Sequence, residues 1–234
     1  MNKDKDRVLY NDVLDFKTNY CNENTIIPEL LKEKAEQYLV APILDCGAGL
    51  GDIANKAFPN KEAILLDVNP IDDSELQISP LHNVVVQSIF DYSPTSQINT
   101  LFICHTLQFI DSDIERLNTQ IKILNPEYII IVLNENDDIM GELINWTKEN
   151  YQVFNPEEKI EGFPVGYKCI ERIPFKAKVS CETHEQLAKQ ISYLMMIDLS
   201  ETGNDLEIYL QNKLPEPSFI FNQVIEIYQN FNPI

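Results

Sequence analysis

Ile43-Leu-Asp-Cys-Gly-Ala-Gly-Leu-Gly-Asp52 is the stretch that decides the fold of this chain. It begins as a short apolar run, typical of a buried strand, and continues into glycines at alternate positions, Gly47, Gly49 and Gly51. Such glycines let the main chain turn sharply and leave no side chain between the backbone and a ligand. The stretch that follows, Asp52–Ala57, is compatible with a helix. We therefore predict a strand, a tight glycine turn and a helix, in that order.

The same alternation of apolar runs and helix-compatible segments extends over residues 40–134 and is typical of a parallel sheet whose strands are joined by helices. We expect strands at Ile43–Cys46, Ala63–Asp67, Val84–Gln87, Leu101–Cys104 and Tyr128–Leu133. We expect helices at Asp52–Ala57, Asp111–Ile123 and Asp138–Tyr151. Ligands of an open α/β sheet bind at the carboxyl ends of its strands, so functional residues are expected at those ends.

The segments on either side complete the predicted architecture. Apolar positions within residues 7–39 predict one or two helices, which we expect to pack across the top of the sheet. Further strands are predicted at Gly166–Ser180, which partly alternates as a strand with one solvent-facing side does, and at Phe219–Tyr228. Helices predicted at Thr183–Asp198, with a capping-box pattern, and at Asp205–Leu214 lie between these strands. The predicted fold is an α/β, Rossmann-like, doubly wound sheet of seven mostly parallel strands, with N-terminal helices and a helical insertion before the last strand.

Composition and charge exclude several classes of function. Hydrophobic residues make up 44% of the chain and charged residues 24%, the balance of a globular protein. The formal net charge is −19, from 18 Lys plus Arg against 37 Asp plus Glu, so the protein would repel a nucleic-acid backbone and no nucleic-acid partner is expected. The longest apolar run, Tyr128–Leu133, is too short to span a bilayer, so no membrane partner is expected.

The cysteines indicate the compartment. There are 5 of them, widely separated and without a CxxC or Cys/His pair. This odd number and spacing predict neither a disulfide framework nor a zinc site. A reducing, cytoplasmic location is therefore expected.

An acidic residue accompanies each of the first two predicted strands. Asp45 precedes the glycines, and Asp67 ends the second strand. The run from Asp45 to Gly51, an acid followed by Gly-x-Gly-x-Gly, resembles the first motif of the class I S-adenosylmethionine-dependent methyltransferases. A dinucleotide-binding loop would read Gly-x-Gly-x-x-Gly, but Asp52 stands at its last glycine and would repel a pyrophosphate. The resemblance covers about residues 40–134 and implies S-adenosyl-L-methionine as the cofactor.

The resemblance also implies which residues bind that cofactor. The first motif, comprising Asp45, Cys46, Gly47, Ala48, Gly49 and Gly51, would hold the methionine portion. Asp67 would bond the ribose hydroxyls, and Val68 would flank the adenine. The family usually ends its third strand in Gly-Asp, whose acid bonds the adenine amino group, whereas this chain has Ser88 there. The Ser88 hydroxyl could still bond the adenine, with a backbone N–H from Ile89 and an apolar face from Phe90.

Residues Leu101–Asp111 resemble the Ser-His-Val-Leu-x-His-x-x-Asp segment of many small-molecule methyltransferases. His105 and Thr106 match the position beside the cofactor's sulfur, and Phe109 replaces the family's second histidine. His105 is the candidate catalytic residue, since an imidazole can accept a proton near neutral pH. The alternative, which we favour, is a residue that contacts the cofactor or packs without exchanging a proton, because methyl transfer from a sulfonium often needs only alignment and desolvation.

The predicted domain is a single methyltransferase domain spanning residues 1–234. Its expected parts are a helical lid at 7–39, a cofactor-binding core at 40–151, and late strands at 152–234 with a helical insertion at 183–214. Tyr10 and Tyr20 lie in the helices that close over the cofactor in relatives and are candidate substrate contacts; the alternative is a core or surface role. The acids Asp111 and Asp113 are expected to cap a helix, so no metal site is predicted.

The function implied by the resemblance is in-line transfer of the sulfonium methyl group to an O, N, S or C nucleophile of a small molecule. Two alternatives stay open. An NAD(P)-dependent oxidoreductase shares the fold and the ribose-binding aspartate. A non-catalytic partner protein could keep the fold without the activity, and the missing acid at Ser88 favours that alternative.

Overall fold

The computed structural model describes residues 15–70, 78–107, 114–151, 163–195 and 204–231. Its internal contacts divide the chain into two compact units. Unit 1 comprises Met1–Ile26, Glu135–Pro156 and Lys176–Asn222, and unit 2 comprises Ile27–Asn134, Glu157–Phe175 and Gln223–Ile234. Two long strands pass from one unit into the other. Each unit is described by itself below.

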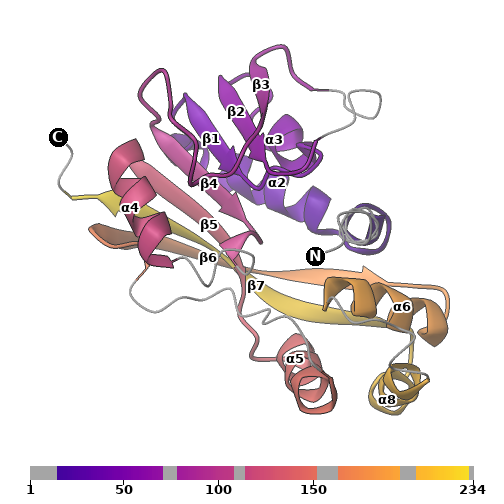
Figure 1. The fold of residues 1–234 in the computed structure, drawn as a ribbon. Helices are drawn as coiled ribbons and strands as arrows, with labels where there is room; N and C mark the ends of the chain where they lie inside the picture. The colour runs from indigo at the N-terminus through magenta and orange to yellow at the C-terminus, as the bar shows by residue number, and fades with distance from the viewer. Residues whose placement is uncertain (1–14, 71–77, 108–113, 152–162, 196–203, 232–234) are drawn as a thin grey trace. The chain divides into compact units, whose positions relative to one another are not determined.

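The strands form one seven-stranded sheet in the order β3-β2-β1-β4-β5-β7-β6 (Figure 1). Their bounds are β1 Ile43–Cys46, β2 Ala63–Asp67, β3 His82–Val86, β4 Thr100–Cys104, β5 Tyr128–Asn134, β6 Tyr167–Ser180 and β7 Ser218–Asn230. Strand β1 pairs in parallel with β2 and β4, and the outer pairs β2–β3 and β4–β5 are parallel as well. Strand β7 runs antiparallel to β5. The predicted doubly wound, mostly parallel α/β fold is confirmed.

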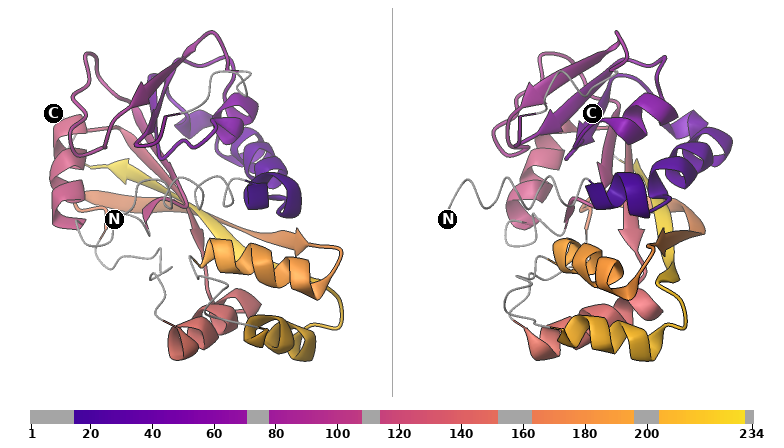
Figure 2. Two further views of the ribbon diagram at one scale, coloured as in Figure 1. Left: turned by 45° about the vertical axis from the view of Figure 1, so that its right-hand side comes forward. Right: turned by 90° about the vertical axis from the view of Figure 1, so that its right-hand side faces the viewer.

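Both faces of the sheet in unit 2 are covered by apolar residues, because each inner strand alternates its side chains between two cores. One core joins the strands to α4 (Ile114–Leu124) and includes Leu44, Leu66, Leu101, Ile103, Ile129, Ile131, Leu117, Ile121 and Leu124. The other joins them to α2 (Glu23–Lys34) and α3 (Asp52–Ala57) and includes Ile43, Leu65, Phe102, Ile130, Val132, Ile27, Leu31, Ala54 and Phe58. Figure 2 shows α2 and α3 on one side of the strands and α4 on the other.

The N-terminal segment differs from expectation in one respect. We expected its helices to pack across the top of the sheet. From Ile27 onward, however, α2 and the short 3-10 helix η2 (Glu36–Tyr38) lie against one face of it. The cause is a spacing of four residues that gives α2 and the turn after it one buried stripe, comprising Ile27, Leu31, Ala35 and Leu39. A lid role therefore stays a prediction only for the part of 7–39 that precedes this stripe.

Most predicted boundaries are close to those in the structure. The predicted bounds of β1, β2 and α3 are correct. Strand β3 begins two residues earlier and ends one residue earlier than predicted, so Gln87 lies outside it. Helix α4 begins at Ile114, and the predicted start at Asp111 lies outside the described residues, as does Asp113.

Unit 1 is built mainly from helices: η1 (Phe16–Tyr20), α5 (Ile139–Asn150), α6 (His184–Leu194) and α8 (Asp205–Lys213). Helix α6 packs against α8 and η1. The predicted cap of α6 is present, because Thr183 Oγ1 accepts a hydrogen bond from the Gln186 N–H at 3.1 Å. The Gln186 side chain reaches back to the N–H of Glu182 at 2.8 Å, one residue beyond the usual partner of a capping box. These contacts fix where the helical insertion begins.

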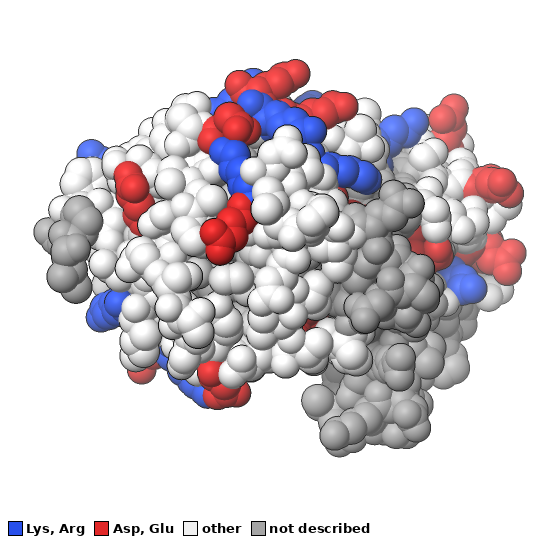
Figure 3. Space-filling model, turned by 90° about the horizontal axis from the view of Figure 1, so that it is seen from above, with Lys and Arg blue, Asp and Glu red and all other residues white. Residues whose placement is uncertain are grey.

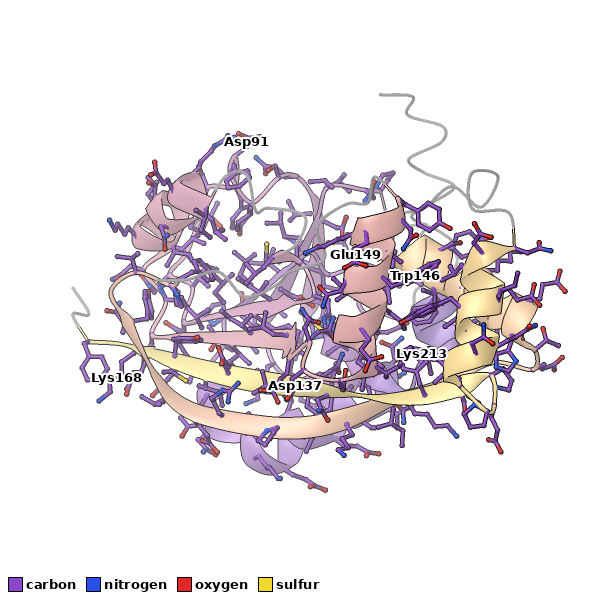
Figure 4. All side chains as sticks on the ribbon, turned by 90° about the horizontal axis from the view of Figure 1, so that it is seen from below. Asp91, Asp137, Trp146, Glu149, Lys168 and Lys213 are labelled. Atoms are coloured by element: carbon purple, nitrogen blue, oxygen red, sulfur yellow. The ribbon has the colours of Figure 1, made fainter. Side chains whose placement is uncertain are left out.

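Aromatic stacking joins α5 to α8 in unit 1. The ring centroids of Trp146 and Tyr209 lie 4.4 Å apart, with an angle of 19° between the ring planes. The ring of Tyr151 meets the Trp146 ring edge-on, with the centroids 5.6 Å apart. Lys213 bonds Glu142 at 2.8 Å across the same pair of helices. Figure 4 shows Trp146 and Lys213 on facing sides of the two helices. Among the described helices, none combines the length and apolar character needed to cross a bilayer.

Candidate functional site

The glycine turn after β1 takes a conformation that favours glycine at each of its three glycines. Gly47, Gly49 and Gly51 have φ angles of +76°, +55° and +74°, in the left-handed region. The N–H groups of Gly47 and Ala48 donate to the carbonyl of Leu66 at 2.8 and 3.1 Å. These bonds anchor the turn to the carboxyl end of β2. The turn then leads directly into α3, as the sequence predicts.

Two of these glycines are also required by close packing. A Cβ atom at Gly47 would lie 2.2 Å from Thr106 Oγ1, and a Cβ atom at Gly51 would lie 2.8 Å from Leu65 Cδ1. Any side chain at Gly47 would therefore collide with the turn after β4. Two predicted parts of the cofactor site, the segment after β1 and the segment after β4, are therefore in direct contact.

Asp67 joins a third segment to the same place. Its side chain is 8% exposed, and its Oδ2 accepts a hydrogen bond from the Gly49 N–H at 2.9 Å. Its Oδ1 accepts from the Asn69 N–H at 2.9 Å and from Asn69 Nδ2 at 3.3 Å. The next residue, Val68, is 65% exposed. Asp67 thus supports the glycine turn and stands next to an exposed apolar surface.

A second buried carboxyl lies under the turn. Asp45 is 3% exposed on β1, where it is paired with Leu65 on one side and Phe102 on the other. Burial, and then the charge of Asp67, raises the pKa of Asp45 from its usual range to about 8. The same burial and the two carboxylates raise the pKa of the Cys46 thiol far above its usual range, so Cys46 is a neutral packing residue and not a nucleophile. Near neutral pH this site favours a neutral Asp45 unless a cation is bound beside it.

The segment after β3 contains the residues predicted to contact an adenine. Ser88 Oγ accepts a hydrogen bond from the Phe90 N–H at 3.3 Å. Ile89 is buried in one core, and Phe90 packs against the same core. The other side of Phe90 is used as well, since the Arg116 guanidinium lies 4.4 Å from its ring centroid and 3.3 Å from Asp91, labelled in Figure 4. The side chains of Ile89 and Phe90 both take part in packing, and an adenine contact by Ser88, Ile89 or Phe90 stays a prediction.

His105 follows β4 and is held in an unusual conformation. It is 5% exposed, and its φ of +50° is uncommon for a residue other than glycine. Its N–H donates to the Val132 carbonyl at 3.3 Å, and its ring Nε2 lies 3.2 Å from Nε2 of Gln223. The neighbouring Thr106 donates its hydroxyl to the Cys104 carbonyl at 3.0 Å. The ring of His105 is therefore buried and engaged, which does not favour free exchange of protons with solvent.

The structure brings most of the predicted cofactor residues together in unit 2. The contacts of Gly49 with Asp67 and of Gly47 with Thr106 join the segments after β1, β2 and β4. Tyr20 belongs to unit 1, where its hydroxyl accepts a hydrogen bond from Gln186 Nε2 at 3.0 Å. Tyr10 lies outside the described residues. The roles of both tyrosines in substrate binding stay predictions.

Sequence reasoning missed two polar residues beside His105. Gln223, on β7, has no exposed surface, and its Nε2 also donates to Asn134 Oδ1 at 2.9 Å. Asn134 follows the predicted strand Tyr128–Leu133, so the expectation of functional residues at carboxyl ends of strands could have found it. Gln223 has no such signal except its polarity within an apolar strand.

Several charged side chains outside the site form pairs of opposite sign. Lys61 and Glu36 are 2.9 Å apart, and Arg116 pairs with Asp91. Figure 3 shows Lys, Arg, Asp and Glu side chains of described residues interspersed on the face that it presents. In the part of the chain that the structure describes, no three His, Cys, Asp or Glu side chains are placed to hold a metal ion.

Solved structures share this fold. A candidate methyltransferase of Bacillus halodurans C-125 matches with a TM-score of 0.58 at 12% identity, over 87% of this chain and 97% of that one. NodS, an N-methyltransferase of Bradyrhizobium japonicum WM9 solved with S-adenosyl-L-homocysteine, matches with a TM-score of 0.56 at 12% identity, over 97% and 98%. The 1,6-didemethyltoxoflavin-N1-methyltransferase of Burkholderia thailandensis, solved with 1,6-didemethyltoxoflavin and S-adenosylhomocysteine, matches with a TM-score of 0.53 at 11% identity, over 98% and 87%.

The sequence itself has no comparable matches. No protein-family model matches it, and no curated protein matches it. At identities this low, the structural matches establish the architecture: the chain has the fold of the class I S-adenosylmethionine-dependent methyltransferases.

Proposed function

We propose that this protein is an S-adenosylmethionine-dependent methyltransferase that acts on an O, N, S or C nucleophile of a small molecule. The observation that carries the proposal is the glycine turn, in which Gly47, Gly49 and Gly51 all have left-handed φ angles and the Gly49 N–H is bonded to the carboxylate of Asp67. Turns of this kind let a ligand approach the main chain closely. The fold comparisons support methyl transfer in general.

The residues present fit the chemistry of this cofactor. Asp45 is a buried carboxyl whose pKa of about 8 reflects burial and the neighbouring acid Asp67, so a bound cation would favour its charged form. The methionine portion of S-adenosylmethionine carries such a cation in its ammonium group. Asp67 offers carboxylate oxygens for ribose hydroxyls, and the exposed Val68 beside it offers an apolar contact for the adenine.

A dinucleotide fits the same turn less well. Helix α3 begins at Asp52, so its first turn presents a carboxylate where a pyrophosphate would need hydrogen-bond donors and a positive helix end. The negative charges of Asp52 and of a pyrophosphate would repel each other and oppose binding. The proposal therefore favours S-adenosylmethionine over NAD(P), although the two cofactors share a ribose that Asp67 could bind.

In the proposed mechanism, the protein acts by binding and positioning. The cofactor supplies a methyl group activated by a sulfonium. Asp45 and the turn hold the methionine portion, Asp67 and Val68 hold the nucleoside, and Thr106 closes the site beside Gly47. Fixing donor and acceptor in line and excluding water can lower a barrier by roughly 7–11 kcal/mol. No proton transfer by a side chain is needed before attack by a neutral amine or by an acceptor that is already an anion.

A small-molecule acceptor is supported by two lines of argument. The methyltransferase of Burkholderia thailandensis, which shares this fold, was solved with bound 1,6-didemethyltoxoflavin. The net charge of −19 disfavours approach to a polyanion. The acceptor is therefore proposed to be a small molecule of the cytoplasm.

Calorimetry tests the cofactor directly. We expect S-adenosylhomocysteine to bind and NAD(H) to bind much more weakly. Asp67→Ala should weaken S-adenosylhomocysteine binding by about 1–3 kcal/mol, because charge-assisted hydrogen bonds are lost. Glu115→Ala removes the same charge from the exposed surface of α4 and should leave the affinity unchanged.

The result has a clear interpretation. Asp67→Asn provides a second variant of similar shape, and melting curves of all variants show whether they remain folded. Equal affinity in folded Asp67→Ala and Glu115→Ala would contradict the proposed ribose contact. Tight binding of NAD(H) alone would replace the methyltransferase proposal by the oxidoreductase.

A further inference from the structure

Gln223 connects three neighbouring strands at the site. It lies on β7 directly opposite Asn134 of β5 in the antiparallel pairing. Its Nε2 is 2.9 Å from Asn134 Oδ1 and 3.2 Å from Nε2 of His105, which follows β4. Gln223 has no exposed surface and His105 is 5% exposed, so water does not compete strongly for these contacts. One amide group therefore links the ends of β4 and β5 to β7.

The chemistry of that amide determines the state of the ring. An amide nitrogen carries two N–H donors and accepts no hydrogen bonds. One donor is directed to the carbonyl oxygen of Asn134, and the other to Nε2 of His105. With the amide in this orientation Nε2 accepts, so the proton of a neutral imidazole lies on Nδ1. Protonation of Nε2 would turn an attractive contact into one between two donors.

The backbone of His105 needs such support. Its φ of +50° is a conformation that costs free energy for a residue with a side chain and persists only where neighbouring contacts enforce it. The N–H bond to Val132 fixes its main chain and Gln223 fixes its ring. His105 immediately precedes Thr106, the residue in contact with the glycine turn at Gly47. The ring is thus held firmly beside the proposed cofactor site.

We propose that Gln223 is a positioning residue that fixes His105 in its Nδ1–H tautomer, so that His105 serves the site as a hydrogen-bond donor and not as a base. The role of His105 in the site rests on the proposed function, whereas its tautomer can be measured independently. The proposal decides between the two readings of His105 that the sequence left open. It also gives a function to a buried glutamine that the cofactor motifs do not include.

Nuclear magnetic resonance tests the tautomer in the full chain. The protein contains 3 histidines, and substituting His82 and His184 one at a time assigns the ring signals of His105. Long-range proton–nitrogen spectra distinguish a protonated ring nitrogen from an unprotonated one. We expect Nδ1 of His105 to carry the proton and Nε2 to be unprotonated at neutral pH. A proton on Nε2 in the native protein would overturn the proposal.

Substitutions at Gln223 test the cause. Gln223→Glu replaces the donor by an acceptor of the same shape, so Nε2 should become protonated. Gln223→Met removes the donor with little change in length and should leave a mixture of tautomers. The matched control is Gln120→Met: Gln120 is also buried, and it donates to the Tyr92 carbonyl at 2.7 Å in the same unit. The control should lose stability but keep the His105 tautomer, and a tautomer unchanged in folded Gln223→Met or Gln223→Glu would contradict the assigned cause.

Binding of S-adenosylhomocysteine separates the two levels of the argument. If the native protein does not bind it, the proposed function fails while the spectra still decide the tautomer. If it binds, Gln223→Met should reduce the affinity by about two- to tenfold, the effect of one hydrogen bond, and Gln120→Met should not. Equal affinities in the two folded variants would overturn the positioning role.

Discussion

A single methyl group added at Gly47 tests whether the turns after β1 and β4 are as closely packed as the structure shows. In Gly47→Ala, the new Cβ atom would lie 2.2 Å from Thr106 Oγ1, 2.5 Å from its Cγ2 and 2.9 Å from its Cβ. The residue would also have to keep a φ of +76°. The left-handed backbone costs about 1–2 kcal/mol for alanine. Overpacking adds about 1–3 kcal/mol. We expect Gly47→Ala to lower the free energy of unfolding by roughly 2–5 kcal/mol.

The chain offers a control that separates these two costs. Gly166 has a φ of +89°, but a Cβ atom there would meet nothing within 4 Å. Gly166→Ala should therefore cost only the backbone part, about 1–2 kcal/mol. Thr106→Ala alone loses the bond from its hydroxyl to the Cys104 carbonyl, worth about 0.5–1.5 kcal/mol.

The double variant Gly47→Ala with Thr106→Ala completes the cycle. It removes the two closest atoms of Thr106 and leaves the contact of 2.9 Å with its Cβ. We expect the double variant to be less destabilised than the sum of the single variants, by about 1–2 kcal/mol. The assay is urea unfolding of the native protein and the four variants at one pH. Strictly additive losses, or a Gly47→Ala no worse than Gly166→Ala, would refute the close contact.

Substitutions at two further sites examine buried charge in unit 2. The pKa of Asp45 is about 8 in the folded protein, against 3.8 for the same carboxyl in the unfolded chain. The stability that comes from this raised pKa is therefore fully present below pH 3.8 and is lost as the pH rises through 8. Asp45→Asn lacks this loss. Its unfolding free energy, compared with that of the native protein, should therefore rise by up to ~1.4 kcal/mol per pH unit in that window. The same difference between the two proteins in urea unfolding at pH 5 and at pH 8 would argue against this explanation. Arg172 bonds Glu226, which is 5% exposed, at 2.9 Å. Arg172→Met should cost about 1–3 kcal/mol because it removes the charged partner of that carboxylate, which still accepts a hydrogen bond from the Tyr228 hydroxyl. The cost is lower than for a fully buried pair because Arg172 is half exposed. Glu226→Gln in the same background should recover part of this cost in thermal unfolding, and no recovery would contradict the ionic explanation.

The parts of the fold that the sequence predicted best are those determined by local pattern. Strands β1 and β2 are short apolar runs buried in the sheet, and the glycines after β1 are required by the backbone itself. Strand β3 is at an edge of the sheet, and its residues are exposed or half-buried, so its pattern is weaker. Its start is set instead by His82, whose ring bonds Asn55 Oδ1 at 3.0 Å and the Phe58 carbonyl at 3.2 Å. Such contacts depend on α3 being in place and cannot be read from the strand.

The placement of α2 shows a second limit. Its buried stripe is visible in the sequence as apolar residues four apart, which establishes an amphipathic helix but not the surface that it covers. The structure places the stripe in the core that contains Phe58 and Phe102, because that face of the strands needs a cover of comparable length. The resemblance supplied the site motifs, whose cofactor contacts stay predictions, and it did not determine this packing.

The contact between Gln223 and His105 joins residues 118 positions apart in the sequence. It could not be predicted from the sequence, for a physical reason. It depends on β7 pairing antiparallel with β5 in a register that sets Gln223 opposite Asn134. A shift of that register by one residue would turn Gln223 away from its face of the sheet and leave the His105 ring without its donor. The sequence did contain one relevant fact: a glutamine within the apolar strand Phe219–Tyr228 must find hydrogen-bond partners if it is buried. The partners that it finds are His105 and Asn134, at the carboxyl ends of β4 and β5, and this contact is the basis for the positioning role proposed for Gln223.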